Sequence, residues 1–220
     1  PQFRVKTMEI QGDAAVSQDE IQKSIQTKVG EIYNVSRLRQ DILAITDLYS
    51  QKGYAYADAN PISQLNDEDR TVDLSVEIDK GKKVYVGNIE ILGNIKTRDN
   101  VIRREFRLKE GEVFDGSKLK RSKQRINNLN YFEDVKIDTH RGQDPDLIDV
   151  LATVTERPTG SFSVGVGFSS IENFIFSTSV TQDNLFGNGQ RLSLNAHLSS
   201  IRTDFKINFT EPRLFDSEVS

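Results

Sequence analysis

The segment from Ser161 to Ser169, SFSVGVGFS, has an apolar side chain at every second position and a small uncharged residue between. Successive side chains of a β-strand point to opposite faces, so this period of two predicts a strand with one apolar and one polar face. Charge is nearly absent nearby: within residues 159–200 only 3 of 42 positions are charged, namely Glu172, Asp183 and Arg191. The pattern restricts this region to a sheet whose polar face carries almost no charge.

Three further segments keep the same period. Their apolar positions are Phe174, Phe176 and Val180, then Leu192, Leu194 and Leu198, then Phe205, Ile207 and Phe209. The first segment consists of Phe162, Ser163, Val164, Gly165, Val166, Gly167 and Phe168. Turn-forming residues at Asn184–Gly189 and Ser200–Asp204 separate the segments, so the sequence predicts a four-stranded antiparallel meander.

Alternation alone does not decide whether the apolar face packs on a protein core or on lipid. A soluble sheet usually exposes Lys and Glu on its wet face, whereas this one carries mostly Ser, Thr, Asn and Gly. That composition is typical of a transmembrane β-barrel, which meets lipid outside and a polar lumen inside. We therefore expect the nine apolar residues of the last three segments to face lipid.

Four strands are too few to close a membrane barrel, which needs about eight. Lipid does not tolerate an open sheet edge, because each unpaired backbone group there costs several kcal/mol. The predicted sheet is therefore the start of a truncated barrel, or it pairs with further strands. The opening residues, PQFRVKTMEI, are already strand-like, so we expect a fragment of a longer protein.

Composition excludes several kinds of chemistry. The 220 residues contain no Cys, which rules out disulfides, thiolate metal sites and cysteine nucleophiles. The net charge of −4 argues against a nucleic-acid binder. The two histidines, His140 and His197, have no metal-ligand spacing, and neither GVG nor GNG has the pattern of a nucleotide loop. We expect no catalytic residue, no cofactor and no metal.

The first 158 residues contain one unit twice. MEIQG at Met8–Gly12 matches IEILG at Ile89–Gly93, and VGEIYN matches EGEVFD at the same offset of 81 residues. At that offset Ile21, Ile25, Leu38, Ile45 and Leu48 coincide with Ile102, Phe106, Leu119, Ile126 and Leu129. Such agreement in one register indicates a duplication. We predict domains at residues 1–80, 81–158 and 159–220.

Each unit is predicted as β-α-α-β-β. In the first, the expected elements are a strand at Arg4–Gln11, a helix that begins at the capping box Ser17/Glu20, a helix through Leu38–Leu48, and strands near Tyr54–Ile62 and Val72–Ile78. In the second, they are a strand at Val84–Leu92, helices near Thr97–Phe106 and Ser117–Asn130, and strands near Glu133–His140 and Leu147–Glu156. Two helices on one face of a three-stranded sheet give a small two-layer α+β core.

Two such repeats followed by an antiparallel membrane sheet resemble the POTRA domains and barrel of the outer-membrane β-barrel assembly family. The motifs that carry the resemblance are GNIEILGN at Gly87–Asn94, NLNYFEDVKI at Asn128–Ile137, TERPTGSFSVGVGFSS at Thr155–Ser170, DNLFGNGQRL at Asp183–Leu192 and FTEPRLFD at Phe209–Asp216. The resemblance implies the last two POTRA domains and the first barrel strands. It also implies a role in folding and inserting outer-membrane proteins, with the repeats in the periplasm.

The implied partners are unfolded outer-membrane protein clients, accessory assembly lipoproteins and outer-membrane lipid, with no nucleic acid. Two strands are candidate contact sites. An edge strand can accept an extended peptide by backbone pairing, and POTRA sheets place an edge at Asp134, Val135, Lys136, Ile137, Asp138, Thr139 and His140. The strand Phe162–Phe168 is the second candidate, as the seam of the barrel, because Gly165 and Gly167 weaken its interior.

Plainer interpretations remain open. The charges around Lys136 are also what protects an inert edge, and the two glycines also relieve crowding in a curved sheet. The 11 basic and 5 acidic residues of Lys96–Arg125 either lie near anionic headgroups or form a solvated helical face. Two other functions share this architecture: a two-partner secretion transporter with one dedicated client, and a POTRA–barrel module of an envelope hydrolase.

Overall fold

A computed structural model describes residues 2–12 and 15–213. Within these, residues up to 89 together with 108–121 and 139–150 form one compact unit, and residues 90–107, 122–138 and 151 onwards form the other. The end of the FTEPRLFD motif, residues 214–216, lies outside the described residues. No helix in the described part of the chain is long and apolar enough to cross a membrane.

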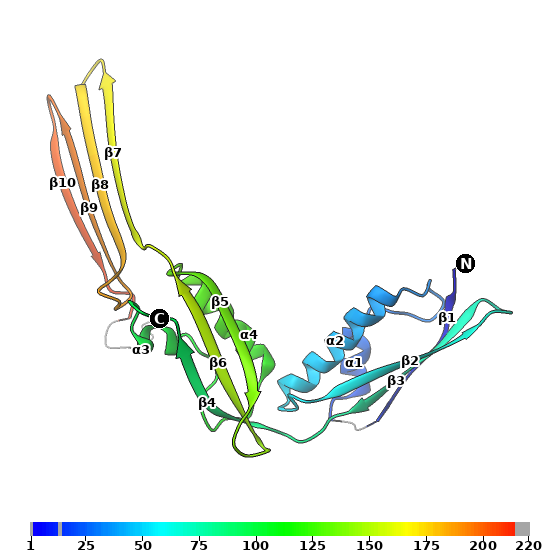
Figure 1. Cartoon of the computed structure of the whole chain (residues 1–220). Helices are drawn as coiled ribbons and strands as arrows, with labels where there is room; N and C mark the ends of the chain where they lie inside the picture. The colour runs from blue at the N-terminus through cyan, green and yellow to red at the C-terminus, as the bar shows by residue number, and fades with distance from the viewer. Residues whose placement is uncertain (1, 13–14, 214–220) are drawn as a thin grey trace. The chain divides into compact units, whose positions relative to one another are not determined.

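The first repeat contains the predicted β-α-α-β-β order. Its elements are β1 (Arg4–Gly12), α1 (Gln18–Ser24), α2 (Val35–Gln51), β2 (Asp58–Asn66) and β3 (Thr71–Asp79). The strand order is β1-β3-β2, with β1 parallel and β2 antiparallel to β3. Both helices lie on one side of this sheet (Figure 1). The four alternating apolar residues of β3 are buried, as predicted: Val72, Leu74, Val76 and Ile78.

The predicted start of α1 is confirmed. The Ser17 hydroxyl accepts a hydrogen bond from the Glu20 N–H at 3.3 Å, and the Glu20 carboxylate accepts one from the Ser17 N–H at 3.4 Å. Val16 and Ile21 are both buried in the core cluster that also contains Ile45. The capping box and the apolar pair therefore determine where this helix begins.

The predicted strand at Tyr54–Ile62 is four residues out of place, because β2 runs from Asp58 to Asn66. The offset of 81 residues holds as far as the second helices, since α2 begins at Val35 and α4 at Gly116. It then fails: α2 has 17 residues and α4 has 13. Because α2 is longer, β2 begins later in the sequence than the strand predicted at residue 54. Tyr54 lies before β2 and packs against the core.

The second repeat contains β4 (Tyr85–Leu92), α3 (Asp99–Arg103), α4 (Gly116–Asn128), β5 (Phe132–Arg141) and β6 (Leu147–Glu156), with strand order β4-β6-β5. The helix predicted at Thr97–Phe106 is shorter, at five residues. Thr97 is held outside it, because its N–H donates to the Glu156 carboxylate at 2.6 Å. Beyond it, the Arg107 N–H donates to the Ser122 hydroxyl at 2.8 Å, which ends the helical path.

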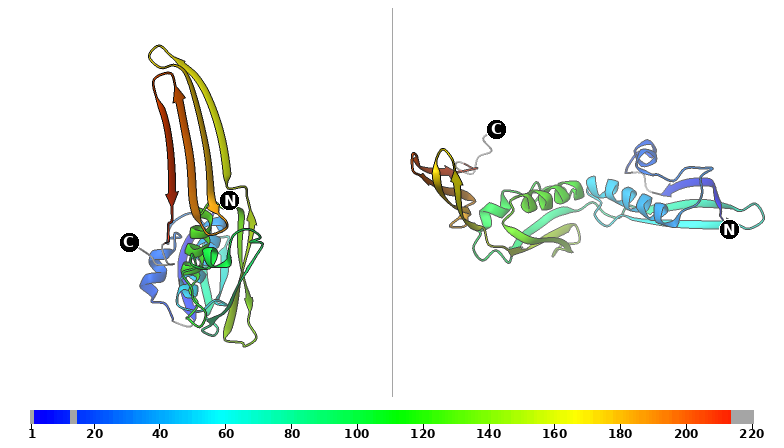
Figure 2. Two further views of the ribbon diagram at one scale, coloured as in Figure 1. Left: turned by 90° about the vertical axis from the view of Figure 1, so that its left-hand side faces the viewer. Right: turned by 90° about the horizontal axis from the view of Figure 1, so that it is seen from above.

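The last part is the predicted antiparallel meander. Its strands are β7 (Gly160–Ser169), β8 (Asn173–Leu185), β9 (Gln190–Ser199) and β10 (Thr203–Thr210), in the order β10-β9-β8-β7. Figures 1 and 2 show them side by side as one curved sheet. The turn predicted at Ser200–Asp204 is tighter, because the Ser199 N–H bonds to the Arg202 C=O and β10 already begins at Thr203.

One buried carboxylate was missed from the sequence. Asp41 on α2 is only 1% exposed. It accepts hydrogen bonds from the N–H groups of Gln26 at 2.6 Å and Thr27 at 3.0 Å. It therefore fixes the segment after α1 against α2 and satisfies two backbone donors that would otherwise be unpaired.

Replacing Asp41 by Ala is expected to lower the free energy of unfolding by about 3 kcal/mol, since hydrogen bonds to a charged group contribute about 1.5–3 kcal/mol each and the donors are left unpaired. Urea unfolding, followed by the helical circular dichroism signal, measures this. The exposed Asp67→Ala is the control and should change the free energy by less than 0.5 kcal/mol, a rough bound for surface sites. Equal effects from the two variants would contradict the assignment.

Candidate functional site

The β7–β10 sheet carries a continuous apolar face. Opposite residues in the register form cross-strand rows, and one row is Phe162, Val180, Leu194 and Ile207. The adjoining rows add Val164, Val166, Phe168, Phe174, Phe176, Leu198, Phe205 and, at the other end, Leu192 and Phe209. Phe162 is 70% exposed and Ile207 73% exposed. The sheet therefore presents this face outward instead of burying it in its own unit.

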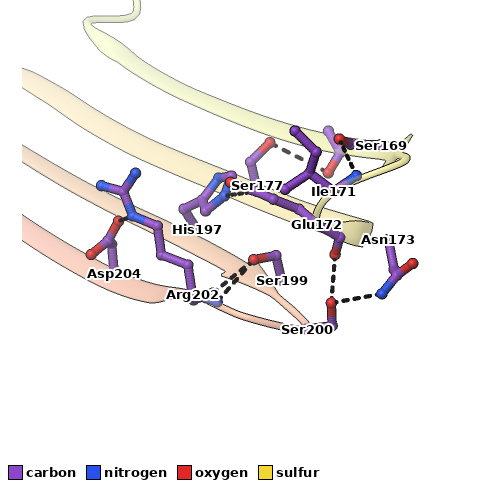
Figure 3. A network of polar contacts seen from close by, with 11 residues as sticks. Ser169, Ile171, Glu172, Asn173, Ser177, His197, Ser199, Ser200, Arg202 and Asp204 are labelled. Carbon is purple, nitrogen blue, oxygen red and sulfur yellow. Dashed lines mark hydrogen bonds and ion pairs between the residues drawn. The ribbon is translucent and has the colours of Figure 1, made fainter.

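The opposite face is polar and internally hydrogen-bonded. The Ser179 hydroxyl donates to the Asn195 amide oxygen at 2.7 Å. Toward the β7–β8 and β9–β10 turns, His197 Nε2 lies 3.2 Å from Glu172 Oε2, and Arg202 pairs with Asp204 (Figure 3). A hollow of about 420 Å³ lies on this part of the sheet. These contacts match the polar, internally satisfied lumen side of a membrane sheet.

The strand β7 is an edge strand of this sheet. It pairs with β8, and no other described strand pairs with its second side. A Cβ at Gly165 would lie 2.7 Å from the Ser177 hydroxyl oxygen, whereas one at Gly167 would meet nothing within 4 Å. Gly165 is therefore the more crowded of the two positions, in line with the plainer interpretation, although rotation of the Ser177 hydroxyl would make room for a Cβ, and Gly167 has open space.

The strand β5 is also an edge strand, as the strand order β4-β6-β5 requires. Among its predicted contact residues, Val135 is 2% exposed and belongs to the core, while Ile137 is half-buried. Asp134, Lys136, Asp138, Thr139 and His140 are exposed. The Lys136 ammonium lies 3.6 Å from the Asp134 carboxylate, so part of the predicted charge on this edge is internally paired.

The first repeat has an equivalent edge that the sequence reasoning missed. In the order β1-β3-β2 the strand that corresponds to β5 is β2, one of the two outer strands. Its Ile62 and Leu65 side chains are 40% and 55% exposed. The internal duplication could have predicted this edge strand from its counterpart β5. The prediction failed because the strand was expected at residues 54–62 instead of Asp58–Asn66.

The β8–β9 end of the four-stranded sheet contacts the second repeat, in a joint that no sequence argument foresaw. Near the end of β8, the Asn184 side chain is buried and donates to the Thr97 hydroxyl at 2.8 Å. The Gly187 C=O accepts from the Arg98 N–H at 3.0 Å. Gly187 has φ +74, and a Cβ there would lie 2.0 Å from the Lys96 carbonyl oxygen. Glycine is therefore needed at this close approach.

Glu156 and Tyr131 complete the joint. The Glu156 carboxylate accepts from the N–H groups of Lys96 at 2.9 Å and Thr97 at 2.6 Å. Partial burial alone would raise the pKa of this carboxyl, but the hydrogen bonds from Thr97 and Lys96 outweigh it and lower the pKa below its ordinary 4.5. Burial, with help from the Asp183 carboxylate, raises the pKa of Tyr131, whose hydroxyl stays protonated and donates to the Gly189 C=O at 3.2 Å.

The described residues contain no group of three or more His, Asp or Glu side chains that could hold a metal ion. His140 is exposed near the end of β5 and His197 lies on the polar sheet face. The features described above are the edge strands β5 and β7, the apolar sheet face and the contacts around Asn184. Such features bind other chains or lipid by backbone pairing and apolar contact.

The family comparison agrees with this architecture. The POTRA family, described as a surface antigen variable number repeat, matches residues 3–81 and 84–157, and the Omp85 superfamily domain matches residues 184–220. The chain belongs to the POTRA family. The predicted fold class, POTRA repeats followed by an antiparallel sheet, is thereby confirmed.

Several individual proteins and one solved structure are similar to this chain over nearly its whole length. The chain is 37% identical over 220 residues to the outer membrane protein assembly factor BamA of Neisseria meningitidis, covering 99% of this chain and 28% of that protein. It is 33% identical to BamA of Nitratidesulfovibrio vulgaris, with coverage of 100% and 28%. A crystal structure of Haemophilus ducreyi BamA lacking POTRA domains 1–3 superposes with a TM-score of 0.83 at 29% identity, covering 96% of this chain and 40% of that one. The predicted resemblance to the outer-membrane β-barrel assembly family is confirmed.

The Glu156 contacts predict a pH-dependent contribution to stability. Because its folded-state pKa lies below 4.5, the contribution is fully present above pH 4.5 and is lost as pH falls through the folded-state pKa. Glu156→Gln should lower the free energy of unfolding by about 1 kcal/mol near pH 7, a value reduced for partial exposure.

Urea unfolding at a series of pH values measures the difference between wild type and Glu156→Gln. The difference should shrink toward zero in acid. A difference that stays constant across the range would show that the carboxylate charge contributes nothing to the joint.

Proposed function

We propose that this chain is part of a protein that folds and inserts β-barrel proteins into the bacterial outer membrane, with its POTRA repeats in the periplasm. The observation that carries the proposal is the exposed apolar face of β7–β10, joined through Asn184 to the second repeat. The relatives named outer membrane protein assembly factor support it. The chain spans about 28% of the length of those relatives, so the activity belongs to the longer protein.

The proposed mechanism is strand pairing without covalent chemistry. An unfolded client strand pairs with the free side of β7, from Phe162 to Phe168, or with the outer side of β5, from Asp134 to His140. Backbone pairing is largely independent of side-chain identity, which suits a protein that handles many clients. The exposed outer residues of β5 leave its backbone accessible. We propose accessory lipoproteins as partners of the repeats. The proposed domains are residues 1–80, 81–158 and 159–220.

Outer-membrane lipid is the proposed partner of the apolar face. The adjacent residues Ile207 and Asn208 of β10 test this, because they lie on opposite faces of one strand. Ile207→Lys should make folding into lipid less favourable by about 1–2 kcal/mol, because a cation on the lipid face costs about 2–4 kcal/mol at the bilayer midplane and less toward the interface. Asn208→Lys, on the lumen side, is the matched control and should cost less than about 1 kcal/mol.

Folding of the intact protein into lipid vesicles across a urea series measures both variants. A penalty that is the same at the two positions, or larger at Asn208, would contradict a lipid-facing assignment of Ile207.

Depletion of the intact protein in its host tests the function itself. We expect many unrelated outer-membrane barrels to fall together, because strand pairing does not select clients by sequence. Quantitative proteomics of the outer-membrane fraction is the measurement, with lipoproteins of the same membrane as the internal control. Loss of one exported protein alone would instead indicate a dedicated secretion transporter.

A further inference from the structure

A pocket of about 540 Å³ lies at the joint, beside the first residues of β7 and the end of β8. Its lining includes Lys96, Glu156, Arg157, Thr159, Gln182 and Phe186. All six belong to one compact unit, so the pocket is formed within that unit.

The pocket continues the apolar face of the sheet. Gln182 lies opposite Gly160 in the register, and the next row on the same face is the one that contains Phe162 and Val180. Along β7 and β8 on this face, the side chains therefore change from apolar to polar at the pocket, whereas β9 and β10 keep Leu192 and Phe209 in the same row. In a membrane sheet that change marks the boundary between hydrocarbon and headgroups.

The charges in the pocket favour one phosphodiester. Lys96 and Arg157 are exposed cations, and the Arg157 Nε–H donates to the Asn130 C=O at 2.7 Å, which orients the guanidinium. The one carboxylate, Glu156, already accepts the N–H groups of Lys96 and Thr97. Two cations and one carboxylate leave a net charge of +1. The Gln182 side chain donates to the Thr159 hydroxyl oxygen at 2.8 Å, so the hydroxyl proton can be donated to a ligand.

Phe186 provides a second, independent indication. Its side chain is 81% exposed, and its backbone adopts φ +52, a conformation that non-glycine residues rarely adopt. The turn therefore presents a large aromatic side chain to the surroundings at the edge of the pocket. Aromatic residues concentrate at this level in membrane barrels, where the ring meets the boundary between headgroups and acyl chains.

We infer that this pocket binds the phosphate headgroup of a membrane phospholipid, with Lys96 and Arg157 on the phosphate and the acyl chains along the Phe162–Val180 row. The inference rests on the proposed membrane role of β7–β10, and the lipid belongs to the leaflet on the side of the repeats. The bound lipid would then hold the joint at a fixed depth in the membrane.

Native mass spectrometry of the intact protein in detergent tests this by titration with phosphatidylglycerol. Lys96→Ala should raise the dissociation constant of the first bound lipid about fivefold, and Lys96→Ala/Arg157→Ala about 25-fold, since each cation near anionic lipid contributes about 1 kcal/mol. Arg121→Ala/Lys123→Ala removes the same charge from an exposed part of α4 and should leave the constant within about twofold.

Equal weakening in the α4 control, or no change in Lys96→Ala, overturns the inference. Displacement of the lipid by millimolar inorganic phosphate overturns it as well, because the pocket is then a site for free anions. If the double variant fails to fold, as circular dichroism would reveal, Lys96→Ala alone decides. None of these results alters insertion of the apolar face, so the pocket can fail while the proposed function stands.

Discussion

The near absence of charge from both faces of β7–β10 is the constraint on which the rest of the structure depends. A sheet with this pattern cannot bury its apolar face in its own small unit, and Phe162 and Ile207 accordingly remain about 70% exposed. An apolar face of this kind is what a lipid-facing sheet presents to hydrocarbon, and Ser, Thr and Asn on the other face bond to one another across strands. In lipid, the edge strand β7 would need a further partner strand, because each backbone group there must be hydrogen-bonded.

Hydrogen bonds attach the four-stranded sheet to the second repeat. Asn184, Gly187 and Glu156 connect the end of β8 and the turn after it to the loop before α3 through side-chain and backbone hydrogen bonds. Glycine at 187 permits a backbone contact that any side chain would block. The contacts fix the end of β8 to the loop before α3, and β7, with its free side, is the strand next to β8.

Sequence reasoning succeeded where local chemistry determines structure. The Ser17/Glu20 box predicted the start of α1, and the period of two predicted the four strands β7–β10. It failed where distant contacts compete with local pattern: Glu156 holds Thr97 outside α3, and a longer α2 displaces β2. Asn184 was assigned to a turn, but its bond to Thr97 joins residues 87 positions apart, a pairing that no periodicity encodes. The contact roles of β5 and β7 remain predictions, although both are edge strands as expected.

The central claim is that one face of this sheet meets hydrocarbon and the other meets water. The chain contains no Cys, so Leu194→Cys and Asn195→Cys each introduce one thiol on opposite faces of β9 for a nitroxide label. In the intact protein in lipid vesicles, electron paramagnetic resonance measures collision of each label with oxygen and with a water-soluble nickel chelate. We predict that the label at 194 collides preferentially with oxygen and the label at 195 with the chelate. Chelate access that is equal at both positions would contradict the account.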